Sequence, residues 1–147
     1  MKGVIAAVCM SEAKGTAKRS VGSCRLRKNH GLVGDAHAGD WHRQVSLLSL
    51  DKIRAFNAAG GAGGAVGDGD FGENLVVDGI DLAALPVGTL LRAGTALLEV
   101  TQIGKECHQH CQVFQRVGDC IMPREGIFAR VLEDGDVAAG DAVEVVA

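Results

Sequence analysis

Short apolar runs separated by glycine turns make up most of this chain. Residues 44–50 (QVSLLSL) become continuously apolar, which predicts a strand buried on both faces. Residues 89–92 and 96–102 flank a tight Ala93-Gly94 turn and predict a hairpin. Residues 11–29 are interpreted as a basic, turn-rich connection. Further strands are expected over residues 2–10, 74–77 and 142–146.

Helical patterns are few and short. Residues 50–58 predict a helix with Ser49 as its N-cap, and residues 81–85 predict one turn that Pro86 stops. Residues 107–117 also have helical character, whereas residues 126–132 fit a strand or a helix equally well. Many short strands and only two or three short helices indicate a mainly β fold. A closed or nearly closed β-barrel is expected, because closure removes exposed strand edges.

Length and composition indicate one globular domain over residues 1–147, since 47% of residues are apolar and 22% are charged. The net charge of −3 argues against a nucleic-acid-binding protein. The apolar run at residues 4–10 is too short to cross a membrane. Five cysteines without an export signal favour reduced thiols in the cytoplasm.

The basic segment over residues 13–34 contains no acidic residue. It is either a solvated face with an exposed loop or an anion-binding wall suited to a phosphate-bearing small molecule. Its cations are Lys14, Lys18, Arg19, Arg25, Arg27 and Lys28.

The stretch CHQHC at residues 107–111, followed by Cys120, contains the strongest candidate chemistry. A thiolate here could carry sulfur or attack an electrophile, with Lys105, Arg116 or Arg124 lowering its pKa. A neighbouring thiol could then resolve a persulfide by forming a disulfide. Alternatively, zinc or another soft metal could be held by Cys107, Cys111, Cys120 and one of His108 or His110. In a third interpretation the cysteines are core residues, which is the expectation for Cys9 and Cys24.

Several residues outside the cysteine stretch are candidate ligand-binding groups. Asp35 and His37 form a carboxylate–histidine pair in the loop of residues 30–42, where a carboxylate could orient the histidine as a base or a metal ligand. Arg43 precedes a buried strand, so it is expected to face an anionic ligand or to pair with Asp35 or Glu73. The further candidates are Asn74, which either donates to a ligand or ends a turn, and Arg124, which could bind phosphate.

Four motifs in order resemble the MOSC family, named after the C-terminal part of molybdenum cofactor sulfurases. The central block is GENLVVDGIDL (72–82) with LPVGTLL (85–91) and ALLEVT (96–101), and His110-Cys111 stands where that family has its signature cysteine. The ending resembles the family in GIFARV (126–131) and AGDAV (139–143). The N-terminal half is similar to stand-alone bacterial members in KGTAK (14–18), GDAHAG (34–39) and RQVSL (43–47).

The resemblance implies a barrel like the small barrel domain of pyruvate kinase and a role in sulfur or molybdenum cofactor chemistry. An anionic, pterin-type ligand is expected at a mouth formed by the 30–43 loop, Glu73 and Asn74, and the cysteine segment, with Lys14, Lys18, His37, Arg43 and Arg124 as further contacts. Cys111 would be the principal thiol, as sulfur acceptor and donor or as a molybdenum ligand, and Cys107 or Cys120 would assist it.

Sulfurases carry a pyridoxal-phosphate desulfurase domain for which 147 residues leave no room, so a separate desulfurase or cofactor-biosynthesis enzyme is the expected partner. A non-catalytic, metal-binding accessory module of cofactor biosynthesis is the alternative. A further alternative is a reductase of N-hydroxylated compounds that works with an electron-donating partner.

Overall fold

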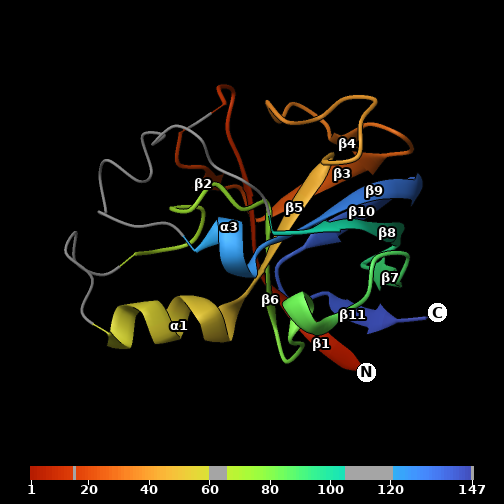
Figure 1. Cartoon of the computed structure of the whole chain (residues 1–147). Helices are drawn as coiled ribbons and strands as arrows, with labels where there is room; N and C mark the ends of the chain where they lie inside the picture. Colours follow the sequence, from red (N-terminus) through yellow and green to blue (C-terminus); the bar gives the residue numbers. More distant parts are fainter. Residues whose placement is uncertain (15, 60–65, 105–120, 147) are drawn as a thin grey trace.

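The computed structural model describes residues 1–14, 16–59, 66–104 and 121–146 (Figure 1). Its helices are α1 (Leu50–Ala58), the 3-10 turn η1 (Leu82–Ala84) and α3 (Met122–Glu125). The strands in chain order are β1 (Lys2–Met10), β2 (Arg19–Ser20), β3 (Ser23–Arg27), β4 (Gly31–Leu32), β5 (Val45–Ser49), β6 (Leu75–Asp78), β7 (Leu90–Ala93), β8 (Ala96–Ile103), β9 (Ile127–Glu133), β10 (Gly135–Ala138) and β11 (Ala142–Val145).

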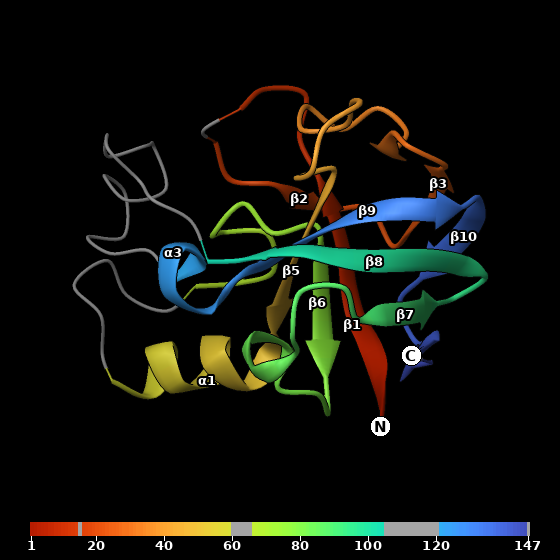
Figure 2. The same ribbon diagram turned by 45° about the vertical axis from the view of Figure 1, so that its right-hand side comes forward.

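Seven of the described strands close into a barrel, which confirms the predicted fold class. The strand order is β11-β7-β8-β9-β5-β6-β1, and β1 pairs back onto β11 through Lys2↔Glu144 and Val4↔Ala142. Most neighbouring strands run antiparallel, but β5 and β6 are parallel and are joined by the connection that contains α1. Figure 2 shows the long strands β8 and β9 side by side, with α3 at one end of the pair.

Alternation along the strands decides which side chains fill the barrel. On β8, Ala96, Leu98 and Val100 belong to the inner core, while Glu99 faces outward. A second apolar cluster lies outside the barrel, where Ile53 of α1 packs with other buried residues; its members include Leu48, Phe71, Val76, Met122 and Phe128. Strand β5 serves both clusters and all its residues are buried, which confirms the prediction for this run.

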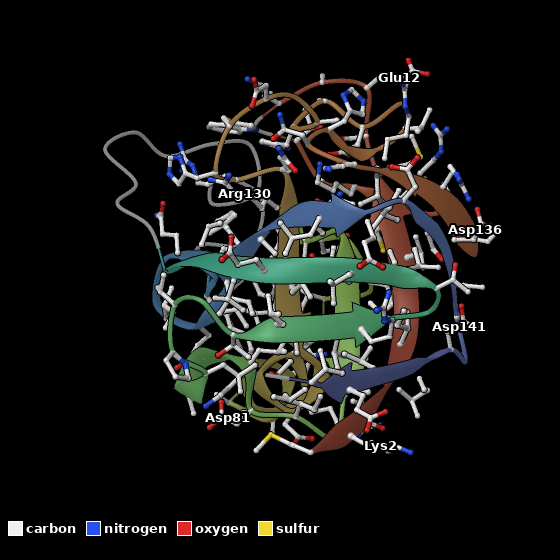
Figure 3. The ribbon with its side chains drawn as sticks, turned by 90° about the vertical axis from the view of Figure 1, so that its right-hand side faces the viewer. Lys2, Glu12, Asp81, Arg130, Asp136 and Asp141 are labelled. Carbon is white, nitrogen blue, oxygen red and sulfur yellow. The ribbon has the colours of Figure 1, made fainter. Side chains whose placement is uncertain are left out.

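A small sheet of order β10-β3-β4 was not predicted from the sequence. Residues 11–29 were expected to be a turn-rich connection, which was wrong for Ser23–Arg27, because these residues form β3. Strand β3 buries only Leu26 fully, so its apolar pattern is weak. Its partner β10, which carries Asp136 (labelled in Figure 3), is more than a hundred residues away. The Arg25 guanidinium lies 3.3 Å from the Asp136 carboxylate across the pair. Residues 127–133, which fitted strand or helix, form β9.

Ser49 occupies the predicted N-cap position of α1, but its hydroxyl does not cap the helix. The hydroxyl donates to the carbonyl of Ile80 at 2.8 Å and accepts from the N–H of Leu82 at 3.0 Å. Ser49 therefore connects the end of β5 to η1. The part of the chain that the structure describes has no helix of sufficient length and hydropathy to span a membrane.

Candidate functional site

The loop between β4 and β5 meets the segment before β2 at a buried ion pair. The Lys18 ammonium lies 2.8 Å from Asp35 Oδ1, and neither side chain is exposed. The same ammonium is 3.0 Å from His37 Nδ1 and 3.3 Å from Ser11 Oγ. The fold thus brings Lys18 to the Asp-Ala-His motif. Asp35 and His37 are 17 and 19 residues away from Lys18 in the sequence.

Asp35 is held as a carboxylate despite its burial. Burial by itself would raise the pKa of this carboxyl, but the Lys18 ammonium, by hydrogen bond and charge, keeps the pKa below its usual value. Backbone N–H groups of Ser11 and His37, each 3.1 Å from a carboxylate oxygen, act in the same direction. The carboxylate therefore fixes both the backbone of the loop and the position of the lysine.

Trp41 organises the cations at the outer part of this loop. Its indole N–H donates to the His37 carbonyl at 2.7 Å, which fixes the ring relative to the buried ion pair. The Arg43 guanidinium lies 4.7 Å from the centre of the Trp41 ring, and the Lys14 ammonium lies 5.3 Å from it. We call Lys14, His37, Trp41 and Arg43 the loop site.

Arg43 has an unusual environment for a charged side chain. Its guanidinium also lies 5.7 Å from the Phe128 ring, so it contacts two aromatic rings. Its Nε atom is buried and has no hydrogen-bond partner within the described ranges. Within the described ranges Arg43 forms no ion pair with Asp35, which binds Lys18, or with Glu73, so that one of the two alternatives was wrong. The prediction that Arg43 faces an anionic ligand is untested and remains open.

The loop site lies next to the end of β8, where the cysteine-bearing connection to β9 begins. The His42 ring nitrogen Nε2 is 2.8 Å from Gln102 Oε1, and the Thr101 hydroxyl donates to the His42 carbonyl. Two residues after Gln102, the Gly104 N–H donates to the Gly126 carbonyl at 2.7 Å. The connection that carries the cysteines thus leaves the barrel next to the loop site.

The predicted cysteine centre itself lies outside the described residues. This applies to Cys107, His108, Cys111 and Cys120. Arg124 lies in α3, but its side chain is likewise outside the description. Among the residues that are described, no group of three or more His, Cys, Asp or Glu side chains could hold a metal ion. The roles predicted for these residues remain predictions.

Glu73 and Asn74, which were predicted to help form the ligand-binding mouth, are both fully buried. The Asn74 amide, one residue before β6, joins β1 and β5: it donates to the Cys9 carbonyl at 3.0 Å and accepts from the Ser46 N–H at 3.0 Å. The Glu73 carboxylate accepts the N–H groups of Gly69 and Phe71 at 3.0 and 3.1 Å. Both polar side chains are therefore engaged in holding the barrel and its adjoining loop, and cofactor binding by them stays a prediction.

The thiol of Cys9 is close to this buried carboxyl group. Burial, with the negative charges of Glu73 and Asp68, raises the pKa of Cys9 to about 12. Burial also raises the pKa of Cys24. Neither environment favours a thiolate, which agrees with the expectation that these two cysteines are packing residues.

Two contributors to the site were missed in the sequence. Trp41 stands between an aspartate and a histidine that drew more attention, although the single tryptophan of the chain, two residues before Arg43, was a usable signal. Gln102 ends a predicted strand, and only the barrel register brings it to His42. No local pattern in the sequence indicates that contact.

The described residues form a closed β-barrel with a cationic, aromatic loop next to the start of the cysteine-bearing connection. The chain belongs to the MOSC domain family, whose model matches residues 34–144. Strand β1 lies outside that match but is part of the barrel wall. The match excludes Lys18 and the Lys14 of the loop site, and it includes the other loop-site residues and the cysteine segment.

Solved structures with the same fold include YuaD from Bacillus subtilis, with a TM-score of 0.78 and 19% identity over 97% of this chain and 94% of that one. YiiM from Geobacillus stearothermophilus has a TM-score of 0.75 and 19% identity over 99% and 75% of the two chains. YiiM from Escherichia coli has a TM-score of 0.72 and 22% identity over 100% and 70%. At these identities the likeness concerns the fold alone. No curated protein matches the sequence significantly.

Proposed function

We propose that this protein binds an anionic, pterin-type ligand of the molybdenum cofactor class at the loop site, next to a thiol of the cysteine segment. The observation that carries the proposal is the Arg43 guanidinium, which lies between Trp41 and Phe128 with a buried Nε that lacks a partner among the described residues. Membership of the MOSC domain family supports the cofactor class.

The loop site has the chemistry that such a ligand requires. A buried donor without a partner costs about 1–3 kcal/mol, and an anionic oxygen would remove that cost. A guanidinium stacked on an aromatic ring is held rigidly and still offers its edge N–H groups to a phosphate. Lys14 adds a second positive charge over Trp41, and the exposed part of the indole could cover a planar ring.

The donor set therefore fits the cofactor: Arg43 and Lys14 would hold its phosphate, and Trp41 would contact its ring system. When bound, the cofactor supplies a molybdenum centre that accepts thiolate ligands. This chain would orient the ligand through the loop site and exclude water on the side of Phe128. Cys111, on the connection that starts beside His42 and Gln102, would provide the thiolate.

In the sulfur-carrier form of the proposal, Cys111 exchanges sulfur with a partner. A cysteine desulfurase that carries a persulfide would transfer its outer sulfur atom to the Cys111 thiolate. A new S–S bond forms on Cys111, the S–S bond of the partner breaks, and the partner's own thiolate is the leaving group. Cys107 or Cys120 could later attack the inner sulfur of Cys111, giving a disulfide and releasing hydrosulfide.

Ligand binding can be tested with Trp41 fluorescence, because Trp41 is the single tryptophan of the chain. The probe is molybdenum cofactor released anaerobically from a purified molybdoenzyme. We expect a saturable change in Trp41 emission, and about 10–100-fold weaker binding in Arg43→Met, the loss of a charged hydrogen bond. Arg92→Met is the matched control, since Arg92 lies on the exposed face of β7 and pairs with Glu133. Equal affinities for Arg43→Met and the native protein would refute the role of the loop site.

Sulfur transfer is tested by native mass spectrometry and peptide mapping after incubation with a cysteine desulfurase and cysteine. The proposal expects one added sulfur atom on Cys111, absent in Cys111→Ser. Stoichiometric zinc bound by the cysteine segment, without added sulfur, would replace the carrier by the metal-binding accessory module. Retention of both cofactor binding and sulfur transfer in Cys111→Ser would remove Cys111 from the assignment.

A further inference from the structure

Two arginines share an unusual property among the residues that the structure describes. The Nε atoms of Arg43 and Arg130 are buried and have no hydrogen-bond partner within these residues, and no other buried side-chain nitrogen or oxygen atom there shares this property. A buried donor without a partner is unfavourable, so each such group calls for an explanation. Arg43 belongs to the loop site, and the position of Arg130 relative to it decides whether the two act together.

Arg130 lies on β9 and points away from the barrel interior. Its neighbours Ala129 and Val131 belong to the inner core, whereas Phe128 belongs to the apolar cluster outside the barrel. Because side chains alternate along a strand, Arg130 shares the outer face with Phe128 (Figure 3). Two residues along a strand cover about 7 Å. The Arg43 guanidinium lies 5.7 Å from the Phe128 ring, so both arginines border the same short stretch of β9.

The chain that leads into β5 crosses this stretch of β9. In the sheet, β9 lies between β5 and β8. Val45 pairs with Ala129 of β9, but earlier in the chain the His42 carbonyl accepts a hydrogen bond from the Thr101 hydroxyl of β8. The chain between His42 and Val45 therefore runs across the outer face of β9, and Arg43 belongs to it. This crossing places the loop site next to the next outward-pointing residue of β9, which is Arg130.

Arg130 is held loosely by its neighbour on β8. Glu99 Oε1 lies 3.8 Å from Arg130 Nε, which is too long for a hydrogen bond. The two side chains are 43% and 36% exposed, so the ion pair is screened by solvent and contributes little. By comparison, Arg92 reaches Glu133 at 3.0 Å elsewhere on the barrel. The Arg130 guanidinium is thus accessible to an anion from solvent and retains a donor for it.

We infer that Arg130 is a second anion-binding residue beside the loop site, and that Arg43 and Arg130 together bind the anionic part of the ligand. A guanidinium presents parallel N–H groups in one plane, so each arginine can take one phosphoryl group through Nε and a neighbouring Nη. Two such groups along one strand suit an anion with two charged centres, and the ligand class is a diphosphate. The inference rests on the proposed function, because that function assigns the ligand to Arg43.

Isothermal titration calorimetry with inorganic pyrophosphate and phosphate tests the two-arginine site without the cofactor. We expect native protein to bind pyrophosphate more than about 10-fold more tightly than phosphate, through the additional charged contact. Arg130→Met should bind pyrophosphate about 10–100-fold more weakly, the loss of a charged hydrogen bond. Arg92→Met, the matched control, should bind it as the native protein does. No saturable pyrophosphate binding, no preference over phosphate, or native affinity in Arg130→Met would overturn the inference.

Replacement of Glu99 acts in the opposite direction and leaves the arginine intact. Glu99→Gln removes the carboxylate near Arg130 Nε, so pyrophosphate should bind about 2–5-fold more tightly. A damaged fold does not produce tighter binding, which separates this result from a loss of stability. Glu133→Gln, which removes the partner of Arg92, is the control and should leave the affinity unchanged. Weaker or unchanged binding in Glu99→Gln would contradict an anion beside Arg130.

The cofactor titration followed by Trp41 emission separates this inference from the proposed function. Weaker cofactor binding in both Arg43→Met and Arg130→Met supports both. If Arg43→Met weakens cofactor binding and Arg130→Met does not, the proposed function stands and the inference fails. If pyrophosphate binding depends on both arginines but the released cofactor does not bind, the anion site stands and the proposed function fails.

Discussion

Replacing Glu73 with glutamine tests whether one buried carboxyl group makes the stability of this barrel depend on pH. Glu73 is 0% exposed, and the N–H groups of Gly69 and Phe71 donate to its two oxygens. Burial raises the pKa of Glu73 from 4.5 to about 7 and outweighs those hydrogen bonds, which act in the opposite direction. The folded protein thus keeps a proton that the unfolded chain loses.

The sign and size of the effect follow from this difference. The stabilising contribution is fully present below pH 4.5, decreases as the pH rises, and is lost by about pH 7. A shift of the pKa from 4.5 to about 7 corresponds to about 3 kcal/mol of unfolding free energy. For a domain of this size that is on the order of 10 °C in Tm.

The assay is urea denaturation at a series of pH values for the native protein and Glu73→Gln, followed by circular dichroism. Asp35 has the opposite pH dependence, because its pKa is lowered, and subtracting the two proteins cancels its contribution. The native-minus-variant difference should fall by about 3 kcal/mol between pH 4.5 and about pH 7. Glu144→Gln, on the exposed face of β11, should give no such slope. A constant difference for Glu73→Gln would refute the reasoning.

Three further substitutions or reactions test the packing around this carboxyl group. Gly69→Ala should lower Tm far more than the control Gly22→Ala in thermal melts. Both glycines have a positive φ, but a Cβ at Gly69 would lie 2.1 Å from the Lys18 carbonyl oxygen, whereas a Cβ at Gly22 would meet nothing within 4 Å. Asn74→Ala should cost about 3 kcal/mol in urea denaturation, since it leaves buried backbone groups unpaired; a loss below about 1 kcal/mol would contradict this. Cys9 should resist alkylation in the folded protein, as its pKa of about 12 implies, and rapid labelling detected by mass spectrometry would count against its burial.

Local patterns predicted the elements whose burial is strong and continuous. The run at residues 44–50 became β5, and the helix at Leu50–Ala58 has the predicted bounds. The hairpin around Gly94 formed as expected because that glycine adopts a positive φ. Strand β3 was missed because it exposes most of its side chains and depends on pairing with β10. Pairing over such a distance leaves little trace in a local pattern.

The candidate site was predicted residue by residue but not as an arrangement. Arg43 was expected to face an anionic ligand or to pair with Asp35 or Glu73; its buried Nε has no hydrogen-bond partner among the described residues, and the ligand is untested. Lys18 was grouped with the other cations of the basic segment, as part of a solvated face or as a contact to an anionic ligand, and the structure buries it against Asp35 and His37. A lysine with no nearby acid in the sequence gives no indication of the carboxylate that the fold brings to it.

The sequence by itself determined the family, the barrel class and which side chains are available for chemistry. The spacing of apolar residues, the glycine turns and the order of the motifs can all be read along the chain. Only the tertiary structure decided which groups meet. Closure of β1 onto β11, and the register of β8 and β9, bring Gln102 to His42 and place the cysteine-bearing connection beside the loop site. Burial, which shifts the pKa values of Glu73 and Cys9, exists only once distant segments pack together.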